Sequence, residues 1–526
     1  MQIHVKVLKQ ILQNISYNDE EYTEVERPER ERVGRIIMKK KITAKYVIGF
    51  DGEDHVIIKD GEVVYENDTI VYVGHHFDGE VDEVIDTGNA VVSPGFIDLN
   101  ALGDIDHDIV HLEQASARNK NMLWSEDYYR KGYHEVMTPE EEAFKSLYAY
   151  SQLILNGVTT AMPITSVFYK RWAETYEELA AAADHAGRLG LRMYMGPSYQ
   201  SGMRVVKANG EIEVLWNEAE GQAGLERAVQ FVKDFDGAHN GLIRGMLAPE
   251  RIETQSVENL INTKRYSEEL GCPIRLHAAQ GLYEYTEIHR RHNKSPIQFL
   301  NEIGFLGKKT AIPHAHFIPG FSKANFGEGD DLAILQETGT TVIHCPLVVG
   351  RHGEALESFA RYKRRGVNIA IGTDTFPPDF IQNIRTASML SRLVEGDVTD
   401  SSYADIYRAA TLGGARFLGR DDLGRLAPGA KADIIAIDLD GFHMGAVDDP
   451  IRTIITCGSG RDVKLSIIAG RTVMKDRLMP GVDLEEIKAK GQRYFDKMRL
   501  GYVERDYQQL GEKELFKPSF PIVSKP

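Results

Sequence analysis

Apolar and polar residues follow different patterns in successive parts of the chain, and each pattern predicts a different kind of structure. Residues 1–36 begin with apolar positions at helical spacing and continue into a segment rich in Glu and Arg, which predicts an N-terminal arm. From residue 37 to 92, short β-branched runs alternate with turn signals, as in the strands of a small antiparallel domain. Between residues 93 and 420, strand patterns alternate with helical patterns, which is typical of parallel βαβ units.

Eight strands are predicted in this central region. One unit shows the pattern well, because Thr138 is a helix N-cap, Pro139 occupies the first helical position and Glu141 completes a capping box before a strand at 158–162. The other strands are expected to end at Asn100 or to cover 192–196, 243–248, 274–278, 310–316, 340–345 and 368–373. Eight such units predict an α/β protein with a (β/α)8 TIM barrel as its catalytic domain.

The residues after the predicted barrel return to short strands. Residues 421–480 carry two such β patterns, and we expect them to join residues 37–92 in one composite β-sandwich domain. Residues 481–526 begin with an N-cap at Asp483 and a helix with an apolar stripe on one side. That stripe predicts burial against the barrel or a contact between subunits.

Composition restricts the class of protein. With 526 residues, 42% of them hydrophobic, the chain can bury a large core. Its formal net charge of −16 disfavours nucleic acid as a partner, because phosphate recognition needs clustered Lys and Arg. Three widely spaced cysteines argue against a disulfide framework and favour a cytoplasmic location. Since neither an apolar leader nor an apolar run of about 20 residues is visible, we expect no export and no membrane insertion.

Polar residues at the predicted strand ends indicate where chemistry can occur. The fifth strand ends near His277, the sixth near His314, the seventh near His344 and the eighth at Asp374. Barrel enzymes place their chemistry at the carboxyl ends of the strands, so these side chains are expected to come together. Imidazole and carboxylate groups are the usual ligands of zinc or iron(II), and an open position on such a metal holds a water that the metal acidifies.

Four motifs resemble those of a known enzyme group. They are Pro-Gly-Phe-Ile-Asp at 94–98, Leu-Ala-Pro-Glu at 247–250, the segment 338–346 that ends in His-Cys-Pro, and the closing motif 423–433 that ends in Ala-Lys-Ala-Asp. In their order and content they resemble the amidohydrolase superfamily, in the branch of cytosine- and adenosine-type deaminases and triazine chlorohydrolases. The resemblance covers residues 42–476. It implies one divalent transition metal as cofactor, zinc first, with iron or manganese as alternatives.

The resemblance also implies roles for individual residues. His277 matches the strand-five metal ligand, and His314 matches the strand-six histidine that contacts substrate and water beside the metal. Asp374 matches the strand-eight ligand that also accepts a proton, so it is the expected general base. Gln280 stands where the branch has the Glu of its His-x-x-Glu motif; because an amide cannot carry a proton, Gln280 is expected to orient substrate or water.

The first strand departs most from the family pattern. Asn100 and Leu102 stand where the superfamily has a metal-binding His-x-His pair, and Leu102 cannot coordinate a metal. The most economical site has His277, His314 and Asp374 around one ion, with Asn100 or a carboxylate of the loop 103–108 weakly attached.

Further polar residues are candidates for substrate binding. Asp106 and His107 lie in the loop just after strand one, and Glu250 occupies a place where the family often has a substrate-binding His. His316 follows His314 by two residues, a spacing that points both side chains to the same face of a strand.

Together these features predict a metal-dependent hydrolase that attacks a C–N or related C–X bond of a small, cyclic, nitrogenous molecule, in a homodimer or larger homo-oligomer. Two alternatives remain open. One is a catalytically silent barrel retained as a binding or assembly subunit. The other is a metal-free lyase or isomerase on the same barrel.

Overall fold

The structure is a computed structural model that describes residues 38–105, 123–164, 170–321, 329–354, 356 and 359–523. The chain divides into two units, Met1–Ile37 and Met38–Pro526, and only the second contains described residues. The arm predicted for residues 1–36 therefore lies outside the described part. Within that part, no helix is long and apolar enough to cross a membrane.

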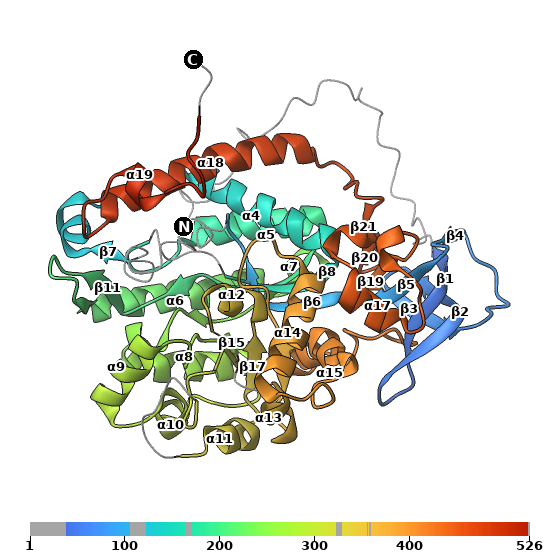
Figure 1. The fold of residues 1–526 in the computed structure, drawn as a ribbon, viewed down its shortest axis with the longest axis horizontal. Helices are drawn as coiled ribbons and strands as arrows, with labels where there is room; N and C mark the ends of the chain where they lie inside the picture. The colour runs from blue at the N-terminus through green and yellow to red at the C-terminus, as the bar shows by residue number, and fades with distance from the viewer. Residues whose placement is uncertain are drawn as a thin grey trace, which may run out of the picture. The chain divides into compact units, whose positions relative to one another are not determined.

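The two flanks of the chain share one eight-stranded sheet, whose strands lie side by side in Figure 1. Its order is β21-β20-β19-β5-β1-β2-β3, with β4 paired to β1. The antiparallel pairing of β5 with β19, from Pro94↔Ile434 to Ala90↔Asp438, joins the flanks. The strands are β1 (Lys39–Phe50), β2 (His55–Glu66), β3 (Thr69–Gly74), β4 (Glu83–Asp86), β5 (Ala90–Pro94), β19 (Ile434–Asp438), β20 (Val463–Ile468) and β21 (Arg471–Lys475). The boundaries of a composite domain stay a prediction.

All eight predicted strands of the central region are present, and they form two parallel four-stranded sheets. The orders are β13-β9-β8-β6 and β15-β16-β17-β18. A parallel bridge between Leu247 and Ile274 connects the two sheets. The strands are β6 (Phe96–Leu102), β8 (Val158–Ile164), β9 (Arg192–Met195), β13 (Ile243–Gly245), β15 (Ile274–Arg275), β16 (Thr310–Pro313), β17 (Thr341–His344) and β18 (Ile369–Ile371).

Helices separate these strands along the chain, which confirms the predicted alternation of strand and helix. The capping box of α4 is present: Glu141 N donates to Thr138 Oγ1, and Thr138 N donates to the Glu141 carboxylate. The main helices are α4 (Pro139–Leu155), α5 (Tyr176–Leu189), α6 (Glu218–Phe235), α8 (Val257–Leu270), α9 (Leu282–His292), α10 (Pro296–Glu302), α11 (Asp331–Thr338), α12 (Pro346–Arg351), α13 (Phe359–Arg364), α14 (Phe380–Glu395), α15 (Tyr403–Arg408) and α17 (Pro450–Cys457).

The C-terminal helix α18 (Leu484–Arg505) begins at the predicted cap, Asp483, and lies along α4 (Figure 1). Met498 and Tyr502 from its apolar stripe are buried with Ile105 and Met137 in a small hydrophobic cluster. The prediction that the stripe is buried against the body of the protein is therefore confirmed. A second role of this helix between subunits stays a prediction.

Candidate active site

His277 follows β15 and is held by main-chain pairing. A parallel bridge joins it to Arg251, and its ring Nδ1 lies 3.1 Å from the carbonyl oxygen of Glu250. Because a carbonyl oxygen only accepts hydrogen bonds, Nδ1 carries the proton and Nε2 keeps a free lone pair. Burial first, and the charge of Arg251 second, hold the pKa of His277 well below its usual value. The ring is therefore neutral, as a metal ligand must be.

The chain turns sharply where β16 and β18 end. His314, Ala315 and Asp374 all have positive φ, at 67°, 45° and 48°, a region that residues other than Gly rarely adopt. The turn at Asp374 is fixed because its N–H donates to the carbonyl oxygen of Asn100 at 2.8 Å. Unusual backbone angles of this kind cluster at functional sites, where the surrounding structure maintains them.

His277, His314 and Asp374 come together as expected, with one ligand atom from each within 4.8 Å of the others. Nε2 of His314 lies 3.1 Å from Asp374 Oδ2, yet neither ring nitrogen of His314 makes a hydrogen bond within the described residues. A buried polar atom is normally hydrogen-bonded, so nitrogens without partners beside a carboxylate need another explanation. Lone pairs that converge on one point fit a metal ion.

Asn100 is completely buried under the same site. Its side-chain Nδ2 contacts Cys345 Sγ at 3.6 Å, whereas Oδ1 has no hydrogen-bond partner among the described residues. An unpaired amide oxygen can serve as a weak metal ligand. Leu102, at the end of β6, offers no ligand atom.

Asp98 is a residue whose importance the sequence did not reveal. Its buried carboxylate accepts hydrogen bonds from Thr373 N at 3.1 Å, Thr373 Oγ1 at 2.6 Å and Asn100 N at 3.1 Å, and burial raises its pKa to about 6. Asp98 thus connects β6 to the turn that carries Asp374. Its signal in the sequence is its place as the last residue of the motif at 94–98.

Arg275 is a second unanticipated residue. Its guanidinium is buried and donates to the carbonyl oxygens of Met162 at 3.0 Å and Pro163 at 2.9 Å. Burial lowers its pKa to about 10, and attraction to Asp374 opposes that shift. Arg275 therefore supplies fixed positive charge near the general-base candidate.

Gln280 is paired with Arg251 rather than free in the site. Arg251 Nη1 donates to Gln280 Oε1, and Arg251 Nε donates to Glu250 Oε1 at 2.9 Å. Burial raises the pKa of Glu250, and the neighbouring arginine opposes the shift. Glu250, predicted to bind substrate, thus has a partner within the protein.

Three further residues were predicted to bind substrate, and the structure describes one of them, His316. His316 does not share a strand face with His314, because β16 ends at Pro313 and the chain turns at His314. That geometric argument was wrong; His316 Nε2 instead lies 3.2 Å from Glu354 Oε2. Asp106 and His107 lie outside the described residues. Asp104, from the same loop, accepts a hydrogen bond from Lys145 Nζ at 2.9 Å, so its carboxylate has a structural partner.

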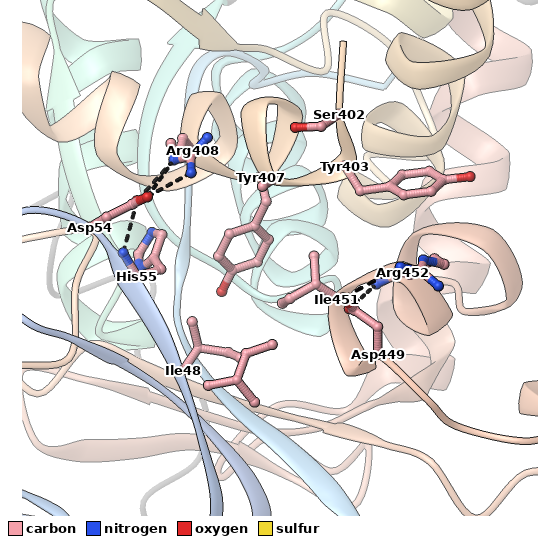
Figure 2. A pocket seen from close by; sticks show the side chains of 12 residues that line it. Ile48, Asp54, His55, Ser402, Tyr403, Tyr407, Arg408, Asp449, Ile451 and Arg452 are labelled. Atoms are coloured by element: carbon pink, nitrogen blue, oxygen red, sulfur yellow. Dashed lines mark hydrogen bonds and ion pairs between the residues drawn. The ribbon is translucent and has the colours of Figure 1, made fainter. Parts of the chain in front are cut away.

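A cavity of about 260 Å³ lies elsewhere, between the β1–β2 hairpin and helices α15 and α17. Among the described residues, no predicted site residue lines it. Figure 2 shows Arg408 directed at Asp54 and Arg452 beside Asp449. The two arginines and two aspartates form ion pairs with each other, so this cavity presents no unpaired charge from these four residues.

Comparison with known proteins identifies the family. The sequence profile described as "Amidohydrolase family" matches residues 91–473. The chain belongs to this family. Among curated relatives, the 5'-deoxyadenosine deaminase of Methanosarcina mazei is 26% identical over 85% of this chain and 95% of its own length. The 5-methylthioadenosine/S-adenosylhomocysteine deaminase of Pyrococcus abyssi is 28% identical over 83% of this chain and 94% of its own length.

Solved structures of similar fold include two that were determined with zinc. One is an adenosine deaminase from Xanthomonas campestris, with a TM-score of 0.70, 20% identity and coverage of 88% of this chain and 99% of that one. The other is a mutant of the atrazine chlorohydrolase TrzN from Arthrobacter aurescens with zinc and atraton, with a TM-score of 0.70, 20% identity and coverage of 87% and 100%. Membership of the amidohydrolase family confirms the prediction of a hydrolase that acts on C–N bonds other than peptide bonds.

Proposed function

We propose that this amidohydrolase hydrolyses the bond between a ring carbon and an amino or related leaving group in a small nitrogen heterocycle. The observation that carries the proposal is the convergence of His277, His314 and Asp374 within 4.8 Å. The named relatives act on adenosine-type nucleosides, and a solved neighbour is a triazine chlorohydrolase. These molecules share an electron-poor nitrogen ring that bears a group which water can displace.

The proposed scaffold is a closed (β/α)8 barrel. Two contacts support closure at the two places where the four-stranded sheets meet. On one side Leu247 bridges Ile274, and on the other Asp374 N donates to the carbonyl oxygen of Asn100. The ring of strands brings their carboxyl ends to one face, where such barrels carry their chemistry.

The donor set fits one divalent metal, and zinc suits two imidazoles with a carboxylate best. His277 Nε2, His314 Nε2 and Asp374 Oδ2 are the proposed ligands, with Asn100 Oδ1 as a weak fourth. When bound, the metal lowers the pKa of a water so that the water can attack at neutral pH. Iron or manganese would be held by the same atoms.

The protein's own groups then handle the proton and the substrate. Asp374 accepts the proton of the attacking water, and Arg275 keeps that carboxylate in a positively charged environment before the transfer. His277 keeps its orientation because Nδ1 stays bonded to Glu250. Glu250 and His316, together with Asp106 and His107 from the loop after strand one, are the proposed substrate contacts.

Metal analysis and a substrate panel test this function. Protein grown with zinc, iron and manganese and purified without chelators should carry about one equivalent of transition metal. His277→Ala should empty the site, whereas His443→Ala, a change of an exposed histidine, should leave the content unchanged. The loaded protein should release ammonia or chloride from at least one member of a panel of aminopurines, aminotriazines and chlorotriazines. Protein without metal, or metal-loaded protein that hydrolyses no panel member, would overturn the proposal.

The homo-oligomeric state and the cytoplasmic location predicted from the sequence stay predictions, as do the domain boundaries at residues 37–92, 93–420, 421–480 and 481–526.

A further inference from the structure

The C-terminal helix α18 lies beyond residues 91–473, the part of the chain that the family profile matches. It contacts the connection between β6 and α4, of which the structure describes residues 103–105 and 123–137, here called the entrance segment. This segment begins directly after β6, and the carbonyl oxygen of Asn100 on β6 accepts the hydrogen bond that fixes the turn at Asp374. Since barrel enzymes carry their chemistry where the strands end, the entrance segment borders the proposed active site.

Apolar side chains of α18 pack against both ends of the entrance segment. Met498 and Tyr502 lie one turn apart on the helix, and both are buried together with Ile105 and Met137. Ile105 lies near the start of the segment and Met137 at its end. The helix therefore holds the two ends of the segment together.

Gly501 brings the backbone of α18 close to the same segment. A Cβ added at this buried glycine would lie 3.2 Å from Val136 Cγ2, which is closer than ordinary van der Waals contact. In the last turn of the helix, Glu504 Oε2 lies 3.3 Å from His134 Nε2. The helix also contacts the short helical turn of residues 128–132. These contacts leave the entrance segment little freedom to move away from α18.

The entrance segment leads on to the polar groups around the site. Within it, β7 (Trp124–Ser125) pairs in parallel with β11 (Gly202–Val206). Arg204 of β11 carries Nη1 3.2 Å from Oε1 of Glu253, a buried carboxylate. Glu253 follows Arg251, the main-chain partner of a proposed metal ligand, by two residues. A shift of the entrance segment would therefore move β11 and change the walls of the site.

We propose that α18 positions the entrance segment against the substrate, with Met498 and Tyr502 as the positioning residues. The inference rests on the proposed function and adds to it an element outside the family profile that determines how tightly the substrate is bound. The proposed metal ligands follow β15, β16 and β18 instead. The helix therefore acts on substrate binding rather than on metal binding or proton transfer.

The size of the effect follows from the fraction of molecules whose entrance segment is in the binding conformation. When that fraction falls to about one tenth, the apparent affinity falls about tenfold, because the substrate binds only the competent state. Weakened contacts with α18 should therefore raise KM about tenfold and change kcat by less than about twofold, as expected when a contribution to binding alone is lost.

Truncation of the buried contacts tests the inference. Met498→Ala and Tyr502→Ala remove the packing, and Leu500→Ala is the matched control, because Leu500 is 49% exposed on the same helix. Steady-state kinetics of the zinc-loaded full chain use the panel member that the parent hydrolyses fastest. The two truncations should show the rise in KM, whereas the control should keep the KM of the parent. Zinc content, measured for every variant, shows that the site is loaded.

A larger side chain at Gly501 separates positioning from stabilisation of the helix. Ala and Leu both favour a helix more than Gly does, so Gly501→Ala and Gly501→Leu leave α18 itself intact. Each adds a side chain at Val136, and Leu adds the larger one, so KM should rise further in Gly501→Leu than in Gly501→Ala. These two variants also carry the test if the truncated helix folds poorly. A helix that only stabilised the fold would instead give kcat and zinc content that fall together.

Hydrogen exchange followed by mass spectrometry reports on the entrance segment without any turnover. The amides of residues 123–137 should exchange at least about fivefold faster in Tyr502→Ala and Gly501→Leu than in the parent, because lost packing permits local opening. The amides of residues 310–312, on β16, should exchange at the rate of the parent.

An unchanged KM in Tyr502→Ala and Gly501→Leu, a joint fall of kcat and zinc content, or unchanged exchange at residues 123–137 would overturn the inference. Its failure can be told apart from failure of the proposed function. Protein that hydrolyses a panel member with the same KM in every variant retains the function and loses the inference. Protein that hydrolyses nothing, yet exchanges faster at residues 123–137 in the variants, loses the hydrolase and retains the positioning role of α18.

Discussion

Asp374 combines two tasks at one carboxylate, since it is the proposed metal ligand and the proposed proton acceptor. Asp374→Asn preserves the volume but removes the negative charge and the basic oxygen. We expect kcat to fall by about 10²- to 10⁴-fold, the range typical of a lost general base. Steady-state kinetics at saturating zinc, with metal content determined in parallel, measures the loss. Gln280→Ala should reduce turnover less, and equal losses in the two variants would mean that the proton-transfer role is assigned wrongly.

The altered first strand leads to a second prediction. Asn100 is fully buried, and its Cβ would lie only 2.7 Å from a Cβ added at Gly372, so little space surrounds it. Although Asn100→His with Leu102→His restores the family's ligands, the larger imidazole in the crowded space at position 100 should lower folding yield and turnover. Zinc titration of the double variant and of the parent compares their metal affinities and tests this expectation. A large gain in affinity with unharmed activity would contradict the expectation and show that the two positions are simply lost ligands.

The sequence predicted part of this site for a clear physical reason. His277, His314 and Asp374 end parallel strands, and the carboxyl ends of parallel strands meet at one face, so their convergence followed from the strand pattern alone. The pairing of Gln280 with Arg251 could not be predicted, because it joins two turns 29 residues apart and has no periodic signal. The His316 argument failed because it assumed that the strand continued beyond Pro313.

The side chain of Asp331 connects the helices α10 and α11 through hydrogen bonds. It accepts hydrogen bonds from Ser295 Oγ at 2.6 Å and Gln298 Nε2 at 3.1 Å, while burial raises its pKa to about 6. A carboxyl whose folded pKa exceeds its unfolded value near 3.8 binds its proton more tightly in the folded state. Its contribution to stability is therefore greatest below pH 3.8 and falls as pH rises to about 6.

Asp331→Asn should remove this dependence. The free energy of unfolding of the parent minus that of the variant should decrease by about 2 kcal/mol between pH 4 and 6, and change little above pH 6.5. Urea unfolding at a series of pH values measures this difference. A difference that stays constant from pH 4 to 7 would show that Asp331 titrates normally.

Helices whose first residues form a capping motif were predicted well. The helix of residues 139–155 begins at Pro139, directly after the N-cap Thr138, and Glu141 completes the capping box, so the sequence marks where this helix begins. Strand pairing between distant segments has no comparable local signal. The order β19-β5-β1, which brings residues near 90 and near 435 into one sheet, depends on the packing of the whole chain.

For the whole molecule, a buried ion pair connects the parallel strands to the flanking sheet. Arg192, on β9, donates from Nε and Nη2 to the two oxygens of Asp433 at 3.0 and 3.1 Å, and both side chains are 4% exposed. Asp433 also accepts from Ala469 N at 2.8 Å. The structure thus gives a physical reason for the aspartate that ends the closing motif 423–433.

Asp433→Asn should destabilise the fold by about 3–5 kcal/mol, because it leaves a buried guanidinium without its counter-charge. Urea unfolding at pH 7 measures the change. Asp60→Asn is the matched control; it removes the partner of Lys45 in an exposed pair and should leave stability nearly unchanged. If Asp433→Asn lowers the free energy of unfolding as little as the control does, other groups stabilise the charge of Arg192.

The pairing of β5 with β19 also affects how the protein is made. Pro94 and Ile434 lie opposite each other in the sheet but about 340 residues apart in the chain. A ribosome adds about 5–20 residues per second, so β5 waits for tens of seconds with an unpaired edge before its partner exists. During that time the emerging chain exposes a strand edge that can pair with another copy. Slow elongation between these strands should therefore lower the yield of folded enzyme without any change in its sequence.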